Sequence, residues 1–373
     1  MKEENSLSLF REIAADPYAY LRRLKEETGL KMIGSTCTYT PEEVIIAAGA
    51  HPFRISGQSQ TLSNSDAHLQ AYSCSMVRCM LEDGLSGKLD FADGVVFPHA
   101  CDSLQRLSDI WRLNIKSLHF DVLLPVKLDS EISKNYFAKV IERFKNDIEK
   151  TLNTTITNQA LQDAIALMNS IRSSMEKLYK IRSKNPSIIK GEDMAAIVKA
   201  SMVMDKKECS AALQEVVGML SGNENKKDGR KRILISGSIC SHPDIYNIIE
   251  NKDAVVVWDD LCSGTRYFEG MVKEENDALK AIAHRFTERY VCPAKHLGVE
   301  FQMANMKKII KEHNIDAVLF IFVKFCEPFS FDYPDMKNEL QKMKIPFLMV
   351  EMDQHNHVDE QLHTRIDTLL EIM

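Results

Sequence analysis

Uninterrupted apolar runs constrain the fold of this chain more strongly than any other feature of its sequence. The clearest run, at 317–323, has an apolar side chain at every position. A strand of this kind needs both of its faces covered, as in a parallel sheet flanked by helices. Further strands are predicted at 232–236, 254–258 and 346–350, with helical patterns between them. We therefore expect residues 229–373 to form a C-terminal α/β domain.

Residues 1–128 show the same alternation and are expected to form an N-terminal α/β domain with a helical start. A short strand at 32–34 leads through a polar loop into a predicted helix at 41–48. Thr40 fits the N-cap of that helix and Pro41 its first residue. The next predicted strands are 93–98 and 118–124.

Residues 129–228 contain no strand pattern and are expected to form a helical middle segment. Their apolar residues recur at spacings of three, four and seven, which is the pattern of one buried helix face. A polar stretch bounded by glycines, 222–229, follows as a linker to the C-terminal domain. The expected fold class is therefore α/β, with two small parallel sheets joined by a helical segment.

Composition excludes several classes of function. The 373 residues carry 47 Lys and Arg against 53 Asp and Glu, a net charge of −6. Such a chain lacks the basic field that holds nucleic acid or an anionic membrane surface. No apolar stretch approaches the roughly 20 residues that span a bilayer, and the N-terminus is charged without an apolar signal core. We expect a cytoplasmic protein with neither nucleic-acid nor membrane partners.

Nine cysteines are the most informative polar residues of the chain. An odd count without a secretion signal argues against a disulfide framework. Three of them, Cys37, Cys101 and Cys326, lie just after predicted strands, at the sheet edge where ligands bind in open parallel sheets. Cys74 follows Ser73, the predicted N-cap of a helix, so that its thiolate would lie in the first turn beside a favourable dipole.

Four cysteines in separate loops suit a soft metal or an iron–sulfur cluster. The chain has no C-x-x-C pair, which argues against a zinc ribbon and against a ferredoxin-type motif. Ordinary buried thiols and a nucleophilic cysteine remain alternatives at this point.

The same cysteine-containing segments carry a resemblance to a known family. The sequence resembles the 2-hydroxyacyl-CoA dehydratase and benzoyl-CoA reductase family, specifically its beta-type subunits, along nearly its whole length. The matching segments are GSTCTYTPEE at 34–43 with AAG at 47–49, CSMVR at 74–78, DGVV at 93–96 with Cys101-Asp102, DDLC at 259–262 with Arg266, and KFCEP at 324–328 with Tyr333-Pro334 and Ile345-Pro346.

The resemblance implies two Rossmann-like domains with a 4Fe-4S cluster between them. It implies a homologous subunit as partner, in a heterodimer or homodimer, and a separate ATP-hydrolysing iron–sulfur activator that injects one low-potential electron. In the dehydratases that electron converts an acyl-CoA thioester into a ketyl radical anion, which expels the hydroxyl group. In the aryl-CoA reductases it begins ring reduction. Both reactions require oxygen to be excluded.

Position by position, Cys74, Cys101 and Cys326 match the three recurring cluster cysteines of the family. Cys37 is the candidate fourth ligand. If Cys37 binds, every iron is coordinated and the chain would be an electron relay, with the substrate pocket in its partner. If it does not bind, an open iron could act as a Lewis acid toward the substrate. A binding protein without a cluster is a further alternative.

A larger cluster remains an alternative, because two further cysteines, Cys262 and Cys292, recur in relatives that resemble the double-cubane group. That group leads us to expect one more cysteine between Cys74 and Cys101. Cys79 lies there instead, about 140° around the helix from Cys74, so the two cannot share one face. We expect Cys79, Cys209 and Cys240 to be packing residues. The acyl-CoA handled and the choice between dehydration and reduction are not defined by the sequence.

Overall fold

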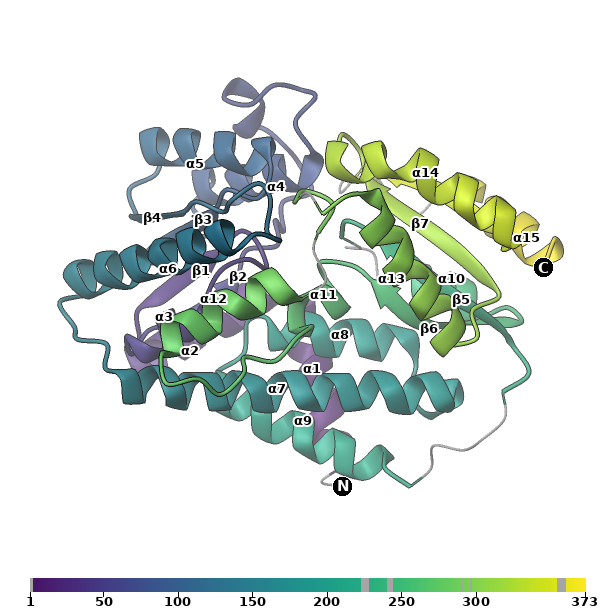
Figure 1. Cartoon of the computed structure of the whole chain (residues 1–373), viewed down its shortest axis with the longest axis horizontal. Helices are drawn as coiled ribbons and strands as arrows, with labels where there is room; N and C mark the ends of the chain where they lie inside the picture. The colour runs from purple at the N-terminus through teal and green to yellow at the C-terminus, as the bar shows by residue number, and fades with distance from the viewer. Residues whose placement is uncertain (1–2, 223–227, 240–243, 290–291, 296, 354–359) are drawn as a thin grey trace.

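The computed structural model describes residues 3–222, 228–239, 244–289, 292–295, 297–353 and 360–373. It contains two four-stranded parallel sheets with helices on their faces (Figure 1). The predicted α/β class is therefore confirmed, and the two sheets are consistent with two Rossmann-like units. None of the described helices is long and apolar enough to cross a membrane.

The first sheet has the order β2-β1-β3-β4. The strand β2 was not predicted; it contains Pro52 and therefore lacks one backbone donor. Because β2 lies at the sheet edge, its outer side needs no partner and the proline is tolerated. The strands and the helices that accompany them are β1 Met32–Ser35, α3 Glu42–Ala47, β2 His51–Arg54, the 3-10 turn η1 Ser65–Ala67, α4 Ser75–Leu85, β3 Gly94–Pro98, α5 Asp102–Asn114 and β4 Leu118–Val122.

The second sheet has the order β6-β5-β7-β8. All seven residues of β7 are buried, as the apolar run predicted. Its elements are β5 Lys231–Gly237, α10 Asp244–Glu250, β6 Ala254–Asp260, α11 Thr265–Phe268, α12 Ala278–Glu288, α13 Val299–Glu312, β7 Ala317–Val323, α14 Glu327–Met343, β8 Phe347–Met352 and α15 Glu360–Glu371.

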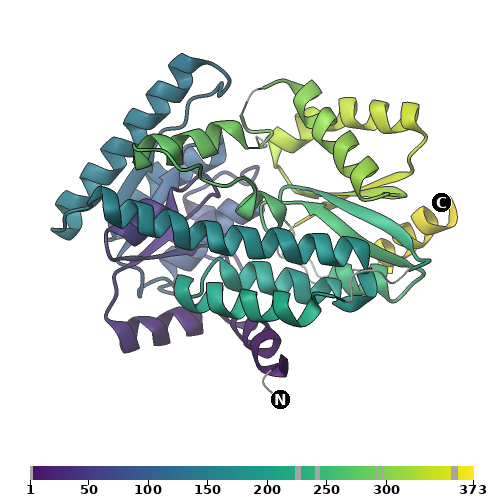
Figure 2. The same ribbon diagram turned by 60° about the horizontal axis from the view of Figure 1, so that its bottom comes forward.

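The middle segment is helical, and α7 runs below both sheets in Figure 1 and in front of them in Figure 2, where the bottom of the molecule is turned forward. Thr157 caps α7 and Asp205 caps α9 through side-chain oxygens that accept backbone N–H groups. One hydrophobic core joins the first sheet to these helices and to α12. The helices are α1 Glu3–Ala15, α2 Pro17–Thr28, α6 Glu131–Leu152, α7 Asn158–Lys184, the 3-10 turn η2 Pro186–Ile188, α8 Gly191–Ser201 and α9 Lys206–Leu220.

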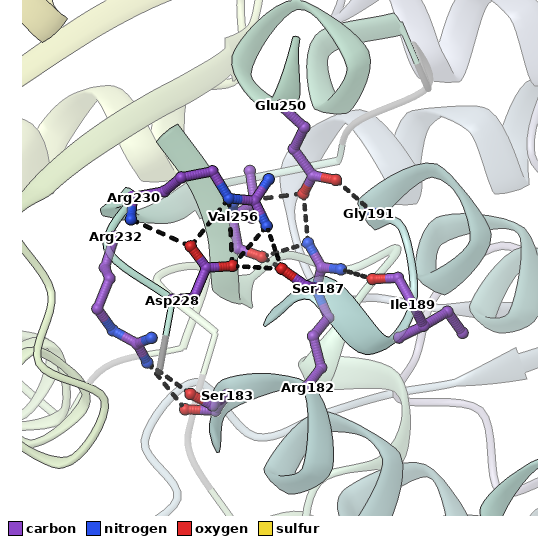
Figure 3. A network of polar contacts seen from close by, with 10 residues as sticks. All are labelled: Arg182, Ser183, Ser187, Ile189, Gly191, Asp228, Arg230, Arg232, Glu250 and Val256. Carbon is purple, nitrogen blue, oxygen red and sulfur yellow. Dashed lines mark hydrogen bonds and ion pairs between the residues drawn. The ribbon is translucent and has the colours of Figure 1, made fainter. Parts of the chain in front are cut away.

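A buried polar network fastens α7 and α8 to the second sheet (Figure 3). Arg182 of α7 donates to the carbonyl of Val256 in β6, at 2.6 and 3.0 Å, and pairs with Glu250. The other carboxylate oxygen of Glu250 accepts the backbone N–H of Gly191, at 2.8 Å. Every buried charge in this network therefore has its partner within the chain, and the second sheet is held firmly on the helical segment.

Two predicted helix starts are shifted by one residue. The N-cap of α3 is Pro41 rather than Thr40, and the hydroxyl of Thr40 is buried without a hydrogen-bond partner among the described residues. The N-cap of α4 is Cys74 rather than Ser73. The second shift matters for the site, because it places the sulfur at the helix start itself.

Candidate functional site

Three helices of the chain begin at predicted ligand cysteines. Cys74 is the N-cap of α4, Cys101 of α5 and Cys326 of α14. Cys101 and Cys326 follow β3 and β7, so they lie at the carboxyl ends of strands in two different sheets. Figure 1 shows α4 and α5 on one side of the gap between the two halves and α14 on the other.

The turn before Cys326 is strained. Phe325 has a φ of 63°, in the left-handed region that side chains other than glycine seldom adopt. That conformation costs about 1–2 kcal/mol. The tight turn brings Cys326 directly from the end of β7 to the start of α14, as functional turns often do.

The sulfurs of Cys74, Cys101 and Cys326 have similar surroundings, because each lies at the start of a helix. The backbone N–H groups of Val77, Leu104 and Phe329, each three residues further on, favour the thiolate forms of Cys74, Cys101 and Cys326. None of the three cysteine side chains accepts a hydrogen bond from the backbone of its own helix in the way that a capping side chain does. Such helix starts attract negative charge.

Hydroxyl groups also face two of the sulfurs. The hydroxyl of Ser103 in α5 favours the thiolate form of Cys74, and that of Ser238, which follows β5, favours the thiolate form of Cys326. These contacts link each sulfur to an element other than its own helix.

Burial nevertheless keeps these thiols protonated when no metal is bound. It raises the pKa of Cys326 to about 12 and places that of Cys101 still higher. Charges on Cys74, Cys37 and Cys326 would raise the pKa of Cys101 further, so these three residues lie within electrostatic range of it. We call Cys37, Cys74, Cys101 and Cys326 the cysteine site.

A second thiol pair lies beside the cysteine site. The neighbouring Cys292 thiol stabilises the thiolate form of Cys262 and so lowers the pKa of Cys262, against the effect of burial. The Arg266 and Arg54 guanidinium groups also favour a Cys262 thiolate, and Arg266 Nη1 lies 3.9 Å from its sulfur. Negative charge on Cys262 in turn raises the pKa of Cys326. The pair is therefore close enough to influence the cysteine site.

Two further cysteines occupy closely packed positions. Cys79 is fully buried and packs against Gly57, where an added Cβ would come within 2.6 Å of the Cys79 Cβ. Cys209 is fully buried near Lys206. Both positions suit the predicted packing role, and Cys240 lies outside the described residues.

Three polar or charged side chains around these loops, those of Glu43, Asp260 and His99, have partners within the protein. Glu43 pairs with Arg172, and Asp260 pairs with Arg266 at 2.7 Å. A ring nitrogen of His99 lies 2.9 Å from the Asp121 carboxylate on β4. These contacts are structural.

Lys295 and Arg54 were not singled out from the sequence. Lys295 is 4% exposed, and its Nζ donates to the carbonyl of His99 at 3.2 Å. Arg54 is buried, and its Nη1 has no hydrogen-bond partner among the described residues. Neither residue belongs to a motif with a chemical meaning, and only the folded chain brings them to the cysteines.

No three His, Cys, Asp or Glu side chains of the described residues are grouped closely enough to hold a single metal ion. In an iron–sulfur cluster each thiolate binds a different iron, so the sulfurs need not converge on one point. The donors fit such a group chemically, because they are thiols at positive helix ends with a buried ammonium nearby. Binding would replace their protons with metal.

The chain is similar in sequence to known proteins over most of its length. The family model described as 2-hydroxyglutaryl-CoA dehydratase, D-component, matches residues 37–373. The beta subunit of (R)-phenyllactyl-CoA dehydratase from Clostridium sporogenes is 28% identical over 365 residues, covering 98% of this chain and 97% of the relative.

Two other relatives represent the two reactions of the resemblance. The beta subunit of (R)-2-hydroxyglutaryl-CoA dehydratase from Acidaminococcus fermentans is 25% identical and covers 97% of both chains. A benzoyl-CoA reductase component from Thauera aromatica is 26% identical, covering 88% of this chain and 87% of the relative. The chain therefore belongs to the family of the 2-hydroxyglutaryl-CoA dehydratase D-component and is related to the beta-type subunits of dehydratases.

Proposed function

We propose that this chain is the iron–sulfur subunit of a cytoplasmic 2-hydroxyacyl-CoA dehydratase, with a 4Fe-4S cluster held by the cysteine site. The observation that carries the proposal is the set of three helices that begin at Cys74, Cys101 and Cys326. The dehydratase relatives, which cover almost the whole chain, support the same reaction class.

When bound, the cluster supplies one electron at low potential for the removal of water from an acyl-CoA thioester. The chain itself contributes the ligands and their surroundings. The thiols lose their protons on binding, and the helix N–H groups with the Ser103 and Ser238 hydroxyls stabilise the resulting negative charge.

Partners complete the proposed activity. The relatives are named as beta subunits, which supports a homologous partner subunit for this chain. We propose that a separate ATP-hydrolysing iron–sulfur activator delivers the electron, and that oxygen must be excluded because low-potential clusters are readily oxidised. Cys37 as a fourth ligand would favour an electron-relay role, with the acyl-CoA pocket in the partner.

Anaerobic reconstitution with iron and sulfide tests the cluster directly. We expect about four irons per chain, together with labile sulfide and visible charge-transfer absorbance. Cys101→Ala should lose most of the iron, whereas Cys209→Ala, a buried cysteine outside the site, should retain it. Wild-type iron content in a combined Cys74→Ala, Cys101→Ala and Cys326→Ala variant would contradict the proposal.

Cys37 separates relay from substrate binding. If it is a ligand, Cys37→Ala should change the paramagnetic spectrum of the reduced cluster. An unchanged spectrum would leave one iron open in the wild-type protein and favour direct contact with substrate.

Two outcomes would favour related functions. An iron content of about eight per chain would support a larger cluster that includes Cys262 and Cys292, whose thiols are in contact. Ring reduction of an aryl-CoA by the assembled complex, without water elimination from a 2-hydroxyacyl-CoA, would support a reductase like the benzoyl-CoA relative.

A further inference from the structure

Lys295 crosses from the C-terminal half of the chain to the first sheet. Its backbone N–H donates to the carbonyl of Cys292, at 2.8 Å, in a tight turn. Its Nζ donates to the carbonyl of His99, at 3.2 Å, in the loop between β3 and Cys101. With 4% exposure, this ammonium is in the interior of the protein.

The charge of Lys295 is poorly matched within the described residues. No carboxylate there lies within ion-pairing distance of Nζ, and one carbonyl is its only hydrogen-bond partner. An ammonium can donate three hydrogen bonds, and burial of an unpaired cation is unfavourable. Lysines are almost never fully buried without such a pair.

The groups whose charges would act on this ammonium are mostly thiols. Burial lowers the pKa of Lys295, and the charges that act against this effect are, in order, those of Cys37, Cys292 and Cys101, then Asp102. Neutral thiols offer little compensation to a cation. The Asp102 carboxylate has the smallest of these effects, so the cation is fully balanced only when the sulfurs also carry negative charge.

We propose that Lys295 is a positioning residue whose ammonium offsets the negative charge of the cofactor in the cysteine site and raises its reduction potential. This inference rests on the proposed function. Reduction adds one negative charge to a cluster with thiolate ligands. A buried cation stabilises that added charge more strongly than an exposed one, because little water screens the interaction.

Potentiometric titration of the reconstituted, oxygen-free protein tests this role. In Lys295→Met, which keeps an unbranched side chain one atom shorter and removes its charge, we expect the equilibrium constant for one-electron reduction to fall at least tenfold. That change corresponds to about 59 mV for one electron. Lys295→Arg retains the charge and should remain within threefold of wild type.

Lys324→Met is the matched control. Lys324 lies two residues before Cys326 in the sequence, but it is exposed. Water screens its charge, so the equilibrium constant should change less than twofold. A wild-type potential in Lys295→Met would overturn the inference, and so would an equal shift in Lys324→Met.

Stability of the protein without iron provides a second measurement. Because Lys295→Met removes an unpaired buried charge, we expect a higher melting temperature than for the wild-type protein without iron. A value at or below wild type would show that the bond to His99 is structural and would overturn the inference. If the wild-type protein takes up no iron at all, the proposed function fails first, which the iron assay shows before any potential is measured.

Discussion

Two lysines are buried to almost the same extent in different regions of the molecule, and they are held in opposite ways. Lys206, 3% exposed, lies at the start of α9. Its Nζ pairs with Glu42 at 3.4 Å and donates to the Ser201 carbonyl at 2.9 Å and the Tyr267 hydroxyl at 3.2 Å. Among the described residues, the Nζ of Lys295 has one hydrogen-bond partner, the His99 carbonyl.

The pKa values follow this difference. Burial alone would lower the pKa of Lys206, but the Glu42 carboxylate raises it above the usual value. The pKa of Lys295 is lowered, because burial outweighs the nearby thiols. The cation of Lys206 is paired within the chain, whereas the cation of Lys295 has no ion-pair partner among the described residues, as the proposed role of Lys295 requires.

The largest effect should come from breaking the paired region. Lys206→Met leaves the Glu42 carboxylate buried without its cation, so the free energy of unfolding should fall by about 3–5 kcal/mol. Urea denaturation followed by circular dichroism measures this loss. Lys207→Met, the exposed neighbour, is the control and should change little. If the free energy of unfolding of Lys206→Met is lower than that of wild type by less than about 1 kcal/mol, the two lysines do not differ as described.

A pH titration tests the same region from a neighbouring residue. His51 is 3% exposed, and a ring nitrogen lies 2.8 Å from the Val203 carbonyl. Burial, followed by the charge of Lys206, lowers the pKa of His51 to about 4, although Asp205 acts in the opposite direction.

The unfolded chain therefore binds this proton near pH 6.5 and the folded chain only near pH 4. Stability should fall as the pH falls between these values, by about 3 kcal/mol, and should not fall further on this account below pH 4. His51→Gln should reduce the slope of unfolding free energy against pH. An identical slope in that variant would remove His51 from the explanation.

The smallest effect should come from an exposed pair, which shows that burial rather than pairing makes the difference. Lys180 and Glu176 on α7 are 2.6 Å apart, and their side chains are 59% and 46% exposed. Lys180→Ala should change the unfolding free energy by less than about 0.5 kcal/mol. A loss as large as that of Lys206→Met would show that α7 depends on its surface charges.

Local patterns predicted most of the fold. The apolar runs located β5, β6, β7 and β8, and the spacing of apolar residues located the helical segment. The short strand β2 was missed because Pro52 weakens its pattern and only its edge position makes it acceptable. The helix starts at Cys74 and Pro41 were misplaced by one residue, because Ser73 and Thr40 are better caps by type.

The cysteine loops were predictable because Cys37, Cys101 and Cys326 directly follow strands. The surroundings of these sulfurs were not. Lys295 can hydrogen-bond to the His99 carbonyl only when the two halves of the chain are packed together. The same holds for the electrostatic effect of Arg54 on Cys262. Contacts between residues so distant in sequence have no local sequence pattern from which they could be predicted.

The proposed ligands also differ in the stage of protein synthesis at which they are added to the chain. The ribosome delivers Cys37, Cys74 and Cys101 with the first sheet, but Cys326 only after the helical segment and most of the second sheet. A cofactor that needs all four must therefore wait for nearly complete synthesis. Until then the newly made thiols are vulnerable to oxidation, and a prematurely terminated chain would keep three of them with no means of closing the site.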